Sequence, residues 1–571
     1  MKKCSKLLTA LSLAAIFCGE IHAEGQWAVT AVPFKIKGEQ AVNNVKLTWD
    51  ILDGAQSYRI LRNGEPVGET TSVVFDDYEL PVGETFTYAV EACGNEGTLA
   101  RSETGATTFV CTGECALYDN LNGKYLKKPI DNNPSGFKIG KKYYKYSMNS
   151  TTVDKVKSWK LTETVSKDGR EDWSQPRVVA EYSGVNFEGN TFKYNPVTKK
   201  VVFISHYEDS DGYTAAKIFL AEITPGGGLK VGTSERPLGF ESRDQSVFID
   251  SDNTAYLLSA TNNNNDINIY LLDKTWTHPI ELCNTICKGA HRETPYIVKK
   301  DGAYYFFSSK ASGWYPSQTM YCSATDLRGE WTPLRTLGSN STFDAQFNRI
   351  QTWDNVAACW SYHWGAQRKY KTPAGNFPRV TILAFNGGTA TMSYFRYVEF
   401  NDKYGVIPVQ NGRILSLAKP VECPVKGSDG VGASCINDGA MCESHPYFKK
   451  SSSAEFGRPY MFTLDLQDDC QLSEINLATR LVNGSECAYK YTIEGSADNK
   501  NYELLHDGRM SWDVGFQILE VDNKKPYRYL RLRVYDVVAV KNGSSQLWAD
   551  GVYELSAYGS PNKGGMTAQN N

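Results

Sequence analysis

A strand pattern that returns three times constrains this chain more than any other feature. Each copy places one polar side chain at the start of an apolar, strand-like segment, and these side chains are Asp244, Glu293 and Gln346. The copies lie about 50 residues apart, and repeats of this length built of short strands are typical of a β-propeller. Because the inner strands of a propeller converge on one axis, we expect the three side chains to share one pocket.

Two of these residues are acids, and a pair of acids with distinct roles is what glycoside hydrolysis needs. Glu293 is the predicted general acid, because burial beside the apolar segment 294–298 would keep it protonated near neutral pH. The alternative is a surface ion pair with Arg292. Asp244 is the predicted companion, whose charge would raise the pKa of Glu293, and its alternative is a turn-capping aspartate.

Length and composition narrow the class of protein. A chain of 571 residues is too long for one domain, and three or four are expected. A net charge of −3 provides no basic surface for nucleic acid. Aromatic residues make up 12% of the chain, which suits stacking on sugar rings but is also typical of β-rich proteins.

The N-terminus reads as a secretory signal peptide over residues 1–23. Basic residues are followed by an apolar run at 7–17, and we place cleavage after Ala23. Cys18 raises a lipoprotein alternative, which Phe17 before it disfavours. No later stretch has the length and hydropathy of a membrane span. The protein is expected to be secreted or periplasmic, with outer-membrane association as an alternative.

The cysteines favour disulfides over a metal site. Twelve of the fourteen lie outside the signal peptide, and three close pairs are disulfide candidates in an oxidising compartment: Cys111 with Cys115, Cys283 with Cys287, and Cys435 with Cys442. A zinc site at Cys111 and Cys115 is disfavoured, because no His or Cys pair follows at finger spacing. No metal and no required cofactor are therefore predicted from the residues.

Strand and turn signals divide the mature chain into three units. Short alternating strands predict a β-sandwich over 27–110. Strand repeats over 115–420 predict a five-bladed β-propeller. A second set of alternating strands occupies 423–560. Long amphipathic helical patterns are missing, so the predicted fold class is all-β: a propeller flanked by an N-terminal sandwich and a C-terminal jelly roll.

The flanking units resemble known modules. Trp49 and the strands at 58–64 and 85–92 resemble a fibronectin type III domain, which implies a spacer. The C-terminal unit resembles the discoidin-like fold of family 32 carbohydrate-binding modules on four segments: 462–466, 489–502, 527–534 and 551–559. That resemblance implies sugar binding and a structural calcium ion, in the region of Asp438.

The propeller resembles glycoside hydrolase family 43, within it the branch of galactan 1,3-β-galactosidases. The resemblance rests on four ordered segments at blade spacing: 242–244, 292–295, 312–316 and 343–346. It implies an inverting mechanism, with Glu293 as acid and Asp244 as its modulator. The usual first-blade Asp base is not matched, although Asp131 lies nearby; the galactanase branch also lacks it, and there a Gln matching Gln346 places the water. Asp344, two residues away on the same strand face, is a rival base.

Further residues are expected to bind the sugar. The resemblance implies that Glu188 binds hydroxyls of the terminal sugar. Tyr213, Trp314 and Trp364 are predicted sugar platforms, each with core packing as the alternative. Arg243 either holds one of the two carboxylates or is a rim charge. The two histidines near these motifs, His206 and His363, are predicted to be structural.

The leading hypothesis is an exported, exo-acting, inverting glycoside hydrolase that removes terminal galactose from β-1,3-galactan, such as the backbone of arabinogalactan. An α-L-arabinofuranosidase or β-xylosidase of the same family is a second hypothesis. A carbohydrate-binding propeller that has lost catalysis is a third, because the first-blade Asp is missing. The expected partner is a polysaccharide or oligosaccharide, and the protein is expected to be a monomer.

Overall fold

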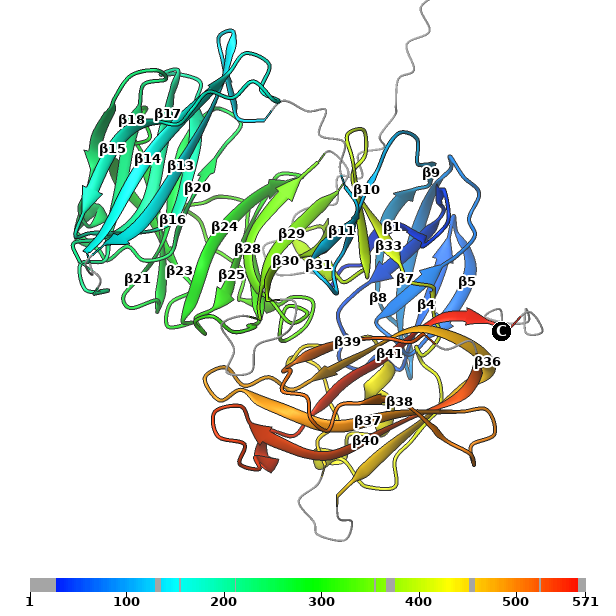
Figure 1. Cartoon of the computed structure of the whole chain (residues 1–571). Coiled ribbons are helices and arrows are strands. Elements are labelled where there is room, and N and C mark those ends of the chain that lie inside the picture. The colour runs from blue at the N-terminus through cyan, green and yellow to red at the C-terminus, as the bar shows by residue number, and fades with distance from the viewer. Residues whose placement is uncertain are drawn as a thin grey trace, which may run out of the picture.

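The protein is built almost entirely of β-strands, as Figure 1 shows. The computed structural model describes residues 27–128, 135–153, 156–210, 212–353, 356–365, 375–450, 458–522 and 525–562. Within these ranges the helical segments are four short 3₁₀ turns: η1 (Pro237–Gly239), η2 (Ser428–Gly430), η3 (Ala433–Asn437) and η4 (Leu547–Ala549). No helix in this described part is long and apolar enough to cross a membrane. The predicted all-β fold class is confirmed.

Five four-stranded sheets follow one another between residues 137 and 393, and each is an antiparallel meander of consecutive strands. This is the strand order of propeller blades. The first two sheets are β12 (Phe137–Ile139), β13 (Lys142–Val153), β14 (Val156–Ser166) and β15 (Arg177–Ser183), then β16 (Asn186–Asn195), β17 (Lys200–Glu208), β18 (Lys217–Ile223) and β19 (Leu229–Thr233). The third is β20 (Gln245–Ile249), β21 (Ala255–Thr261), β22 (Asp266–Leu272) and β23 (Pro279–Ile286). The last two are β24 (Arg292–Lys300), β25 (Ala303–Lys310), β26 (Thr319–Ala324) and β27 (Arg335–Thr336), then β28 (Gln346–Thr352), β29 (Ala357–Trp364), β30 (Asn376–Asn386) and β31 (Thr389–Ser393).

The N-terminal unit consists of two sheets that pack across a shared core around the buried Trp49. One sheet is β4 (Ser57–Arg62), β5 (Glu65–Thr70), β7 (Thr85–Gly94) and β8 (Gly97–Thr107). The other contains β1 (Thr30–Ile36), β3 (Asn44–Thr48) and β6 (Val74–Asp77), while β2 (Ala41–Val42) pairs with β9 (Phe109–Val110).

The second of these sheets extends beyond the predicted unit. The parallel pairing of β1 with β33 (Gly405–Gln410) continues it through β32 (Tyr397–Asn401), β10 (Ala116–Asp119) and β11 (Lys124–Lys127). Residues 116–127 and 397–410, which the sequence analysis assigned to the propeller, therefore share one sheet with the N-terminal unit. The physical reason is that β33 is buried along its whole length and takes the free edge of β1.

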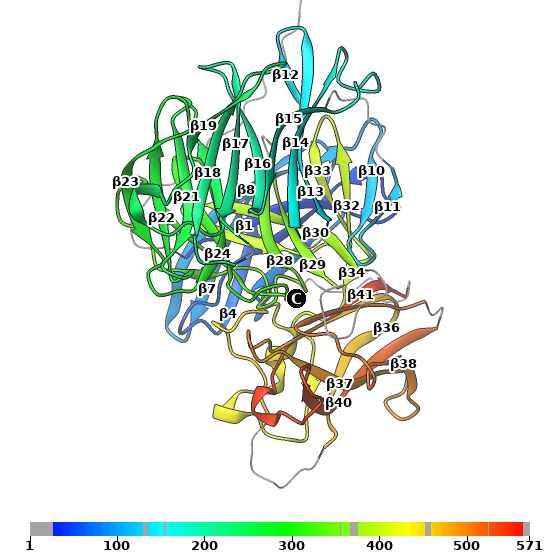
Figure 2. The ribbon, with the colours of Figure 1, turned by 60° about the vertical axis from the view of Figure 1, so that its left-hand side comes forward.

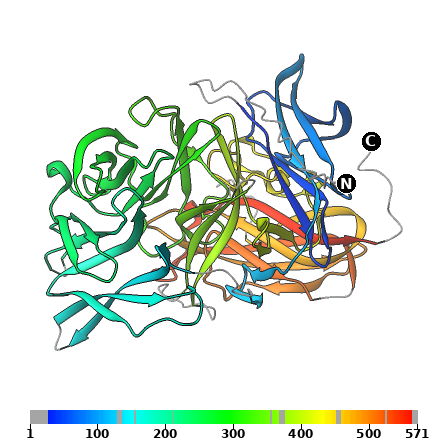
Figure 3. The ribbon, with the colours of Figure 1, turned by 90° about the horizontal axis from the view of Figure 1, so that it is seen from above.

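The C-terminal unit is built on one eight-stranded sheet around a large apolar core. Its strands are β34 (Arg413–Ile414), β35 (Val421–Glu422), β36 (Tyr460–Thr479), β37 (Cys487–Ser496), β38 (Glu503–Asp507), β39 (Phe516–Glu520), β40 (Pro526–Ala539) and β41 (Val552–Pro561). Figures 1 and 2 both show these orange and red strands beneath the rest of the molecule. In Figure 3 the early propeller sheets and the blue N-terminal strands lie on opposite sides of the last propeller sheets.

Two features join the C-terminal unit to the other parts. Phe516 packs edge-on against Phe343, with ring centroids 5.2 Å apart, and lies in the same buried cluster. Arg396, only 2% exposed, donates from Nε to Asp119 at 2.9 Å and pairs through Nη1 with Glu474 of β36 at 3.4 Å. Because Phe343 lies in the turn before β28, its contact with Phe516 packs this turn against the C-terminal unit.

Candidate active site

Three predicted site residues stand at the starts of the first strands of consecutive sheets. Asp244 immediately precedes β20, Glu293 is the second residue of β24, and Gln346 is the first residue of β28. Gln346 Nε2 donates to Glu293 Oε2 at 3.2 Å. Asp244 Oδ2 accepts from the backbone N–H of Thr294 at 3.0 Å. The fold thus brings the three together, linked through Glu293 and its neighbour.

Register shifts and positive φ angles in the backbone accompany these side chains. The pairing of β24 with β25 shifts register between Glu293 and Tyr296, and Thr294 within this bulge has φ +55°. A left-handed conformation is unfavourable for a β-branched residue and costs roughly 1–3 kcal/mol. The first strands β16 and β28 carry comparable shifts, after Glu188 and after Phe347. Bulges that redirect side chains are common next to functional sites.

The surroundings of Glu293 raise the pKa of its carboxyl to near neutral pH. Burial raises its pKa from an ordinary 4.5 to about 7, and the charge of Asp244 adds to this effect. Hydrogen bonds from Gln346 and from the backbone of Ser312 act in the opposite direction, as does the charge of Arg292. The guanidinium of Arg292 is directed away, to Ser308 and to the carbonyl of Gln318.

Asp244 lies in crowded but accessible surroundings. Its side chain retains solvent contact, yet desolvation by the dense protein around it raises its pKa above the ordinary value of 3.8. The Thr294 backbone, the charge of His206 and the Thr294 hydroxyl lower the pKa, whereas the charge of Glu188 raises it.

Glu188 and Tyr213 extend the group on the side of Asp244. The Tyr213 hydroxyl donates to Glu188 Oε1, and Asn186 Nδ2 donates to the same oxygen at 3.3 Å. The Tyr213 ring stacks on the ring of His206, with centroids 6.2 Å apart. One face of Tyr213 therefore rests on protein, and its hydroxyl holds the carboxylate predicted to bind sugar.

Arg243 pairs with a residue other than the two site acids, whereas Trp314 is exposed in a loop next to Glu293. Arg243 forms an ion pair with Glu241, with Nε 3.7 Å from Oε2. The guanidinium therefore pairs with Glu241 rather than with Asp244 or Glu293. Trp314 is 62% exposed, in the loop after β25 whose Ser312 backbone contacts Glu293. Asn483 of the C-terminal unit donates to the carbonyl of Pro316 in this loop at 3.1 Å.

The expectation that Asp344 shares a strand face with Gln346 is wrong. Asp344 has φ +65° and lies in the turn before β28, so strand alternation does not apply to it. Its Oδ2 lies 3.0 Å from Nδ1 of the buried His363. The Gln346 amide instead lies between Glu293 and Trp364, whose indole Nε1 donates to Gln346 Oε1 at 2.8 Å.

Two residues near the site were missed by the sequence analysis. Asn264 Nδ2 donates to Glu293 Oε1 at 3.2 Å, from a turn in which residues 262, 263 and 264 all have positive φ. A run of asparagines, which tolerate this conformation, is the sequence signal that could have found it.

Glu208 accepts from Ala215 and Ala216 and lies 2.9 Å from Nε2 of His206, whose Nδ1 contacts the carbonyl of Ser242 at 2.8 Å. His206 and Glu208 are two residues apart in β17 and so lie on one face of that strand, which is the spacing that could have indicated this buried pair. The pair supports the segment that carries Asp244.

Some sequence predictions fall outside the described residues. These are the signal peptide at 1–23 and the first-blade residue Asp131.

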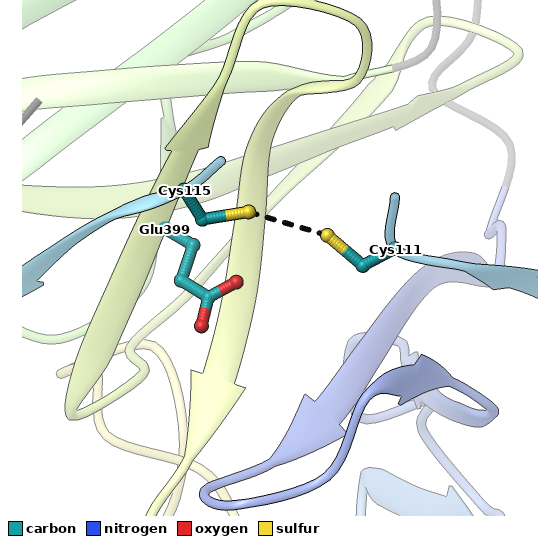
Figure 4. Close-up of side chains that lie close together, drawn as sticks. All are labelled: Cys111, Cys115 and Glu399. Carbon is teal, nitrogen blue, oxygen red and sulfur yellow. Dashed lines mark hydrogen bonds between the residues drawn. The ribbon is translucent and has the colours of Figure 1, made fainter. Parts of the chain in front are cut away.

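One cluster in the described part of the chain has the composition of a metal site. Cys111, Cys115 and Glu399 have ligand atoms within 4.8 Å of one another, as Figure 4 shows. The chemistry fits a cation poorly, because Lys35 Nζ already lies 2.9 Å from Glu399 Oε2, and burial and Cys115 raise the pKa of Cys111 to about 12. The two sulfur atoms are 3.3 Å apart, and all twelve cysteines in the described ranges are free thiols in this structure. None of the three predicted disulfides is therefore formed here.

Comparisons with known proteins found likenesses of limited extent, and no family model matches the chain. Poly(3-hydroxybutyrate) depolymerase of Ralstonia pickettii is 33% identical over 78 residues, which span 13% of this chain and 16% of that protein. Exo-β-1,3-galactanase of Phanerochaete chrysosporium with galactose is 19% identical, with a TM-score of 0.41, covering 72% of this chain and 95% of that one. An exo-β-1,3-galactanase from Clostridium thermocellum is 19% identical, with a TM-score of 0.39, covering 73% and 93%.

Proposed function

We propose that this protein is an exported, exo-acting, inverting glycoside hydrolase that releases terminal galactose from β-1,3-galactan. The observation that carries the proposal is Glu293, a carboxyl whose pKa is raised to about 7 between an amide donor and the charge of Asp244. A proton donor poised near neutral pH is what cleavage of a glycosidic bond requires. The choice of galactan rests on the motif resemblance to the galactanase branch.

The surroundings of Glu293 suit both of its protonation states. Burial and the charge of Asp244 keep the proton on before the reaction. As the proton moves to the glycosidic oxygen, the carboxylate that develops is held by N–H donors from Gln346 and Asn264, at 3.2 Å each. Donors to a developing charge bind the transition state more tightly than the ground state, and this difference is what accelerates the reaction.

Inversion also requires a water on the face of the sugar opposite the acid. We assign the placing of this water to Oε1 of Gln346, the end of the amide turned away from Glu293, because Nε2 donates to Glu293 itself. We assign contacts to the terminal sugar to Glu188 with Tyr213. The exposed Trp314, in the loop that contacts Glu293, would stack on a sugar ring.

Glu293→Gln tests the assignment. This variant should lose release of galactose from β-1,3-galactan by at least about 100-fold, because the amide cannot donate the required proton. The wild type should first release α-galactose, observed by ¹H NMR, as inversion of a β-linkage demands. Glu330→Gln, at an exposed position in the same propeller, is the matched control. Full activity of the Glu293→Gln variant would refute the proposal.

The same acid chemistry also serves an α-L-arabinofuranosidase or a β-xylosidase. Assays of galactose, arabinose and xylose release from arabinogalactan and arabinoxylan separate these activities. If calorimetry shows galactan binding but prolonged incubation at high protein concentration yields no product, the protein is a carbohydrate-binding propeller instead.

For the flanking units we propose a spacer at the N-terminus and a carbohydrate-binding module with a structural calcium ion at the C-terminus. Glu554 is buried and Asp438 is half-buried. Desolvation raises the pKa of both carboxyls, that of Asp438 to about 7, and the charge of Asp438 adds to the rise at Glu554. Glu554 Oε2 accepts from the N–H of Gly439 at 2.9 Å. Oxygen ligands of this kind fit Ca²⁺, which would neutralise the pair.

A further inference from the structure

The orientation of the Gln346 amide is determined by its neighbours. Trp364, the last residue of β29, places Nε1 2.8 Å from one end of this amide. An indole N–H is only a donor, so the atom that it faces has to be the carbonyl oxygen. The NH₂ group therefore faces the other way, where Glu293 Oε2 lies at 3.2 Å and Ser309 Oγ at 3.5 Å.

This arrangement also favours the ordinary amide form of Gln346. For its nitrogen to accept a proton from water, the side chain would have to become an imidic acid, with an O–H in place of the carbonyl. That nitrogen, however, faces Glu293 Oε2 and Ser309 Oγ in a site where Gln346 is only 8% exposed, so it is not turned toward a water molecule. In the amide form, by contrast, the oxygen keeps a second lone pair that can accept a hydrogen bond from water.

Contacts with β29 and β28 hold the Trp364 indole in place beside the Gln346 amide. Its ring stacks on Tyr362, with centroids 4.9 Å apart and planes 25° apart. Tyr362 is the register partner of Gln346 across the ladder between β28 and β29. The indole, the amide and the carboxyl therefore form one chain of hydrogen bonds that begins on β29 and ends on β24.

We propose that Trp364 is a positioning residue that holds Gln346 in its amide form, with the NH₂ group on Glu293 and the oxygen available to a water molecule. Gln346 then holds the water and the acid in place without taking a proton. Trp364 acts through Gln346 rather than as a platform for sugar. This inference rests on the proposed function for its consequence in catalysis, whereas the hydrogen-bond chain can be tested without any substrate.

The first test measures the pKa of Glu293 by ¹³C NMR in the full chain with labelled glutamate. Trp364→Phe keeps an aromatic ring but removes the indole N–H, so the amide is free to turn and Glu293 loses a donor. Its pKa should then rise, by roughly half a pH unit. The same substitution made in a Gln346→Ala background should add nothing further, because a residue that acts through Gln346 has no effect without it. An unchanged pKa, or an equal shift in both backgrounds, overturns the proposal.

Trp360→Phe is the matched control. Trp360 lies on the same strand and stacks on Phe400, and among the described residues its buried Nε1 has no hydrogen-bond partner. This variant should leave the pKa of Glu293 unchanged. If Trp364→Phe does not fold, the ¹⁵N spectrum of the otherwise unmodified protein provides the second measurement. The Trp364 indole N–H should be protected from exchange, and this protection should be lost in Gln346→Ala; persistence of the protection refutes the link.

Kinetics separates positioning from sugar stacking. Trp364→Phe should lower kcat about tenfold with little change in KM, and move the alkaline limb of the pH profile upward with the pKa of Glu293. A rise in KM with unchanged kcat would assign Trp364 to sugar binding and overturn the proposal. Absence of turnover on every glycan would refute the proposed function, while the NMR result would still decide the hydrogen-bond chain.

Discussion

The half-buried acid Glu293 should make the stability of this protein depend on pH, and one substitution should reveal this dependence. The pKa of Glu293 is raised from 4.5 to about 7 in the folded state, chiefly by burial. The folded protein therefore binds this proton more tightly than the unfolded chain. Below about pH 4.5 both states are protonated and the folded state incurs no penalty. As the pH rises toward 7, ionisation of the unfolded chain lowers the free energy of unfolding, by about 3 kcal/mol in total.

Glu293→Gln removes this titration and keeps the size of the side chain. We expect the free energy of unfolding of the variant, relative to wild type, to rise by about 3 kcal/mol between pH 4 and pH 8. Urea unfolding at a series of pH values, followed by tryptophan fluorescence, measures the difference. Glu330→Gln, at the exposed control position, should stay within about 0.5 kcal/mol of wild type throughout. A difference between Glu293→Gln and wild type that does not change with pH would refute the reasoning.

Three further predictions follow from other contacts. Asp244→Asn removes the negative charge that raises the pKa of Glu293, so the alkaline limb of the pH profile of kcat/KM should move to lower pH; an upward shift would contradict this. Because the sulfurs of Cys111 and Cys115 lie 3.3 Å apart, air oxidation should remove two thiols in a quantitative thiol assay, and Cys111→Ser should abolish that loss. Arg396→Met leaves buried carboxylates unpaired and should destabilise the protein by about 3–5 kcal/mol in thermal or urea unfolding, and a loss below 1 kcal/mol would show that the network is not needed.

The sequence predicts the sheets better than the boundaries between units. Strand repeats at 244, 293 and 346 depend on local alternation and turns, and each falls at the start of the first strand of a sheet. The pairing of β1 with β33 joins residues more than 370 positions apart along the chain. No local pattern encodes which exposed edge another strand will take, so 116–127 and 397–410 could not be assigned to their sheet.

The same limit applies to the candidate site. The prediction that Asp244, Glu293 and Gln346 converge depends only on repeat spacing, and the structure brings them together. The prediction for Asp344 assumed that side chains alternate along a strand. This assumption does not hold at Asp344, because its φ is +65°. Asn264 was missed because its contact with Glu293 depends on a turn in a neighbouring sheet.

The sequence by itself determined which residue types stand at the start of each repeat, and hence that two acids and an amide would meet. This follows from strand periodicity and spacing, which are properties of the chain over short distances. Only the tertiary structure decided what these groups do to one another. Burial and the charge of Asp244 set the protonation of Glu293, and the donor on Trp364 determines which end of the Gln346 amide faces it. Both effects arise from groups brought within a few ångströms by packing, which no one-dimensional pattern specifies.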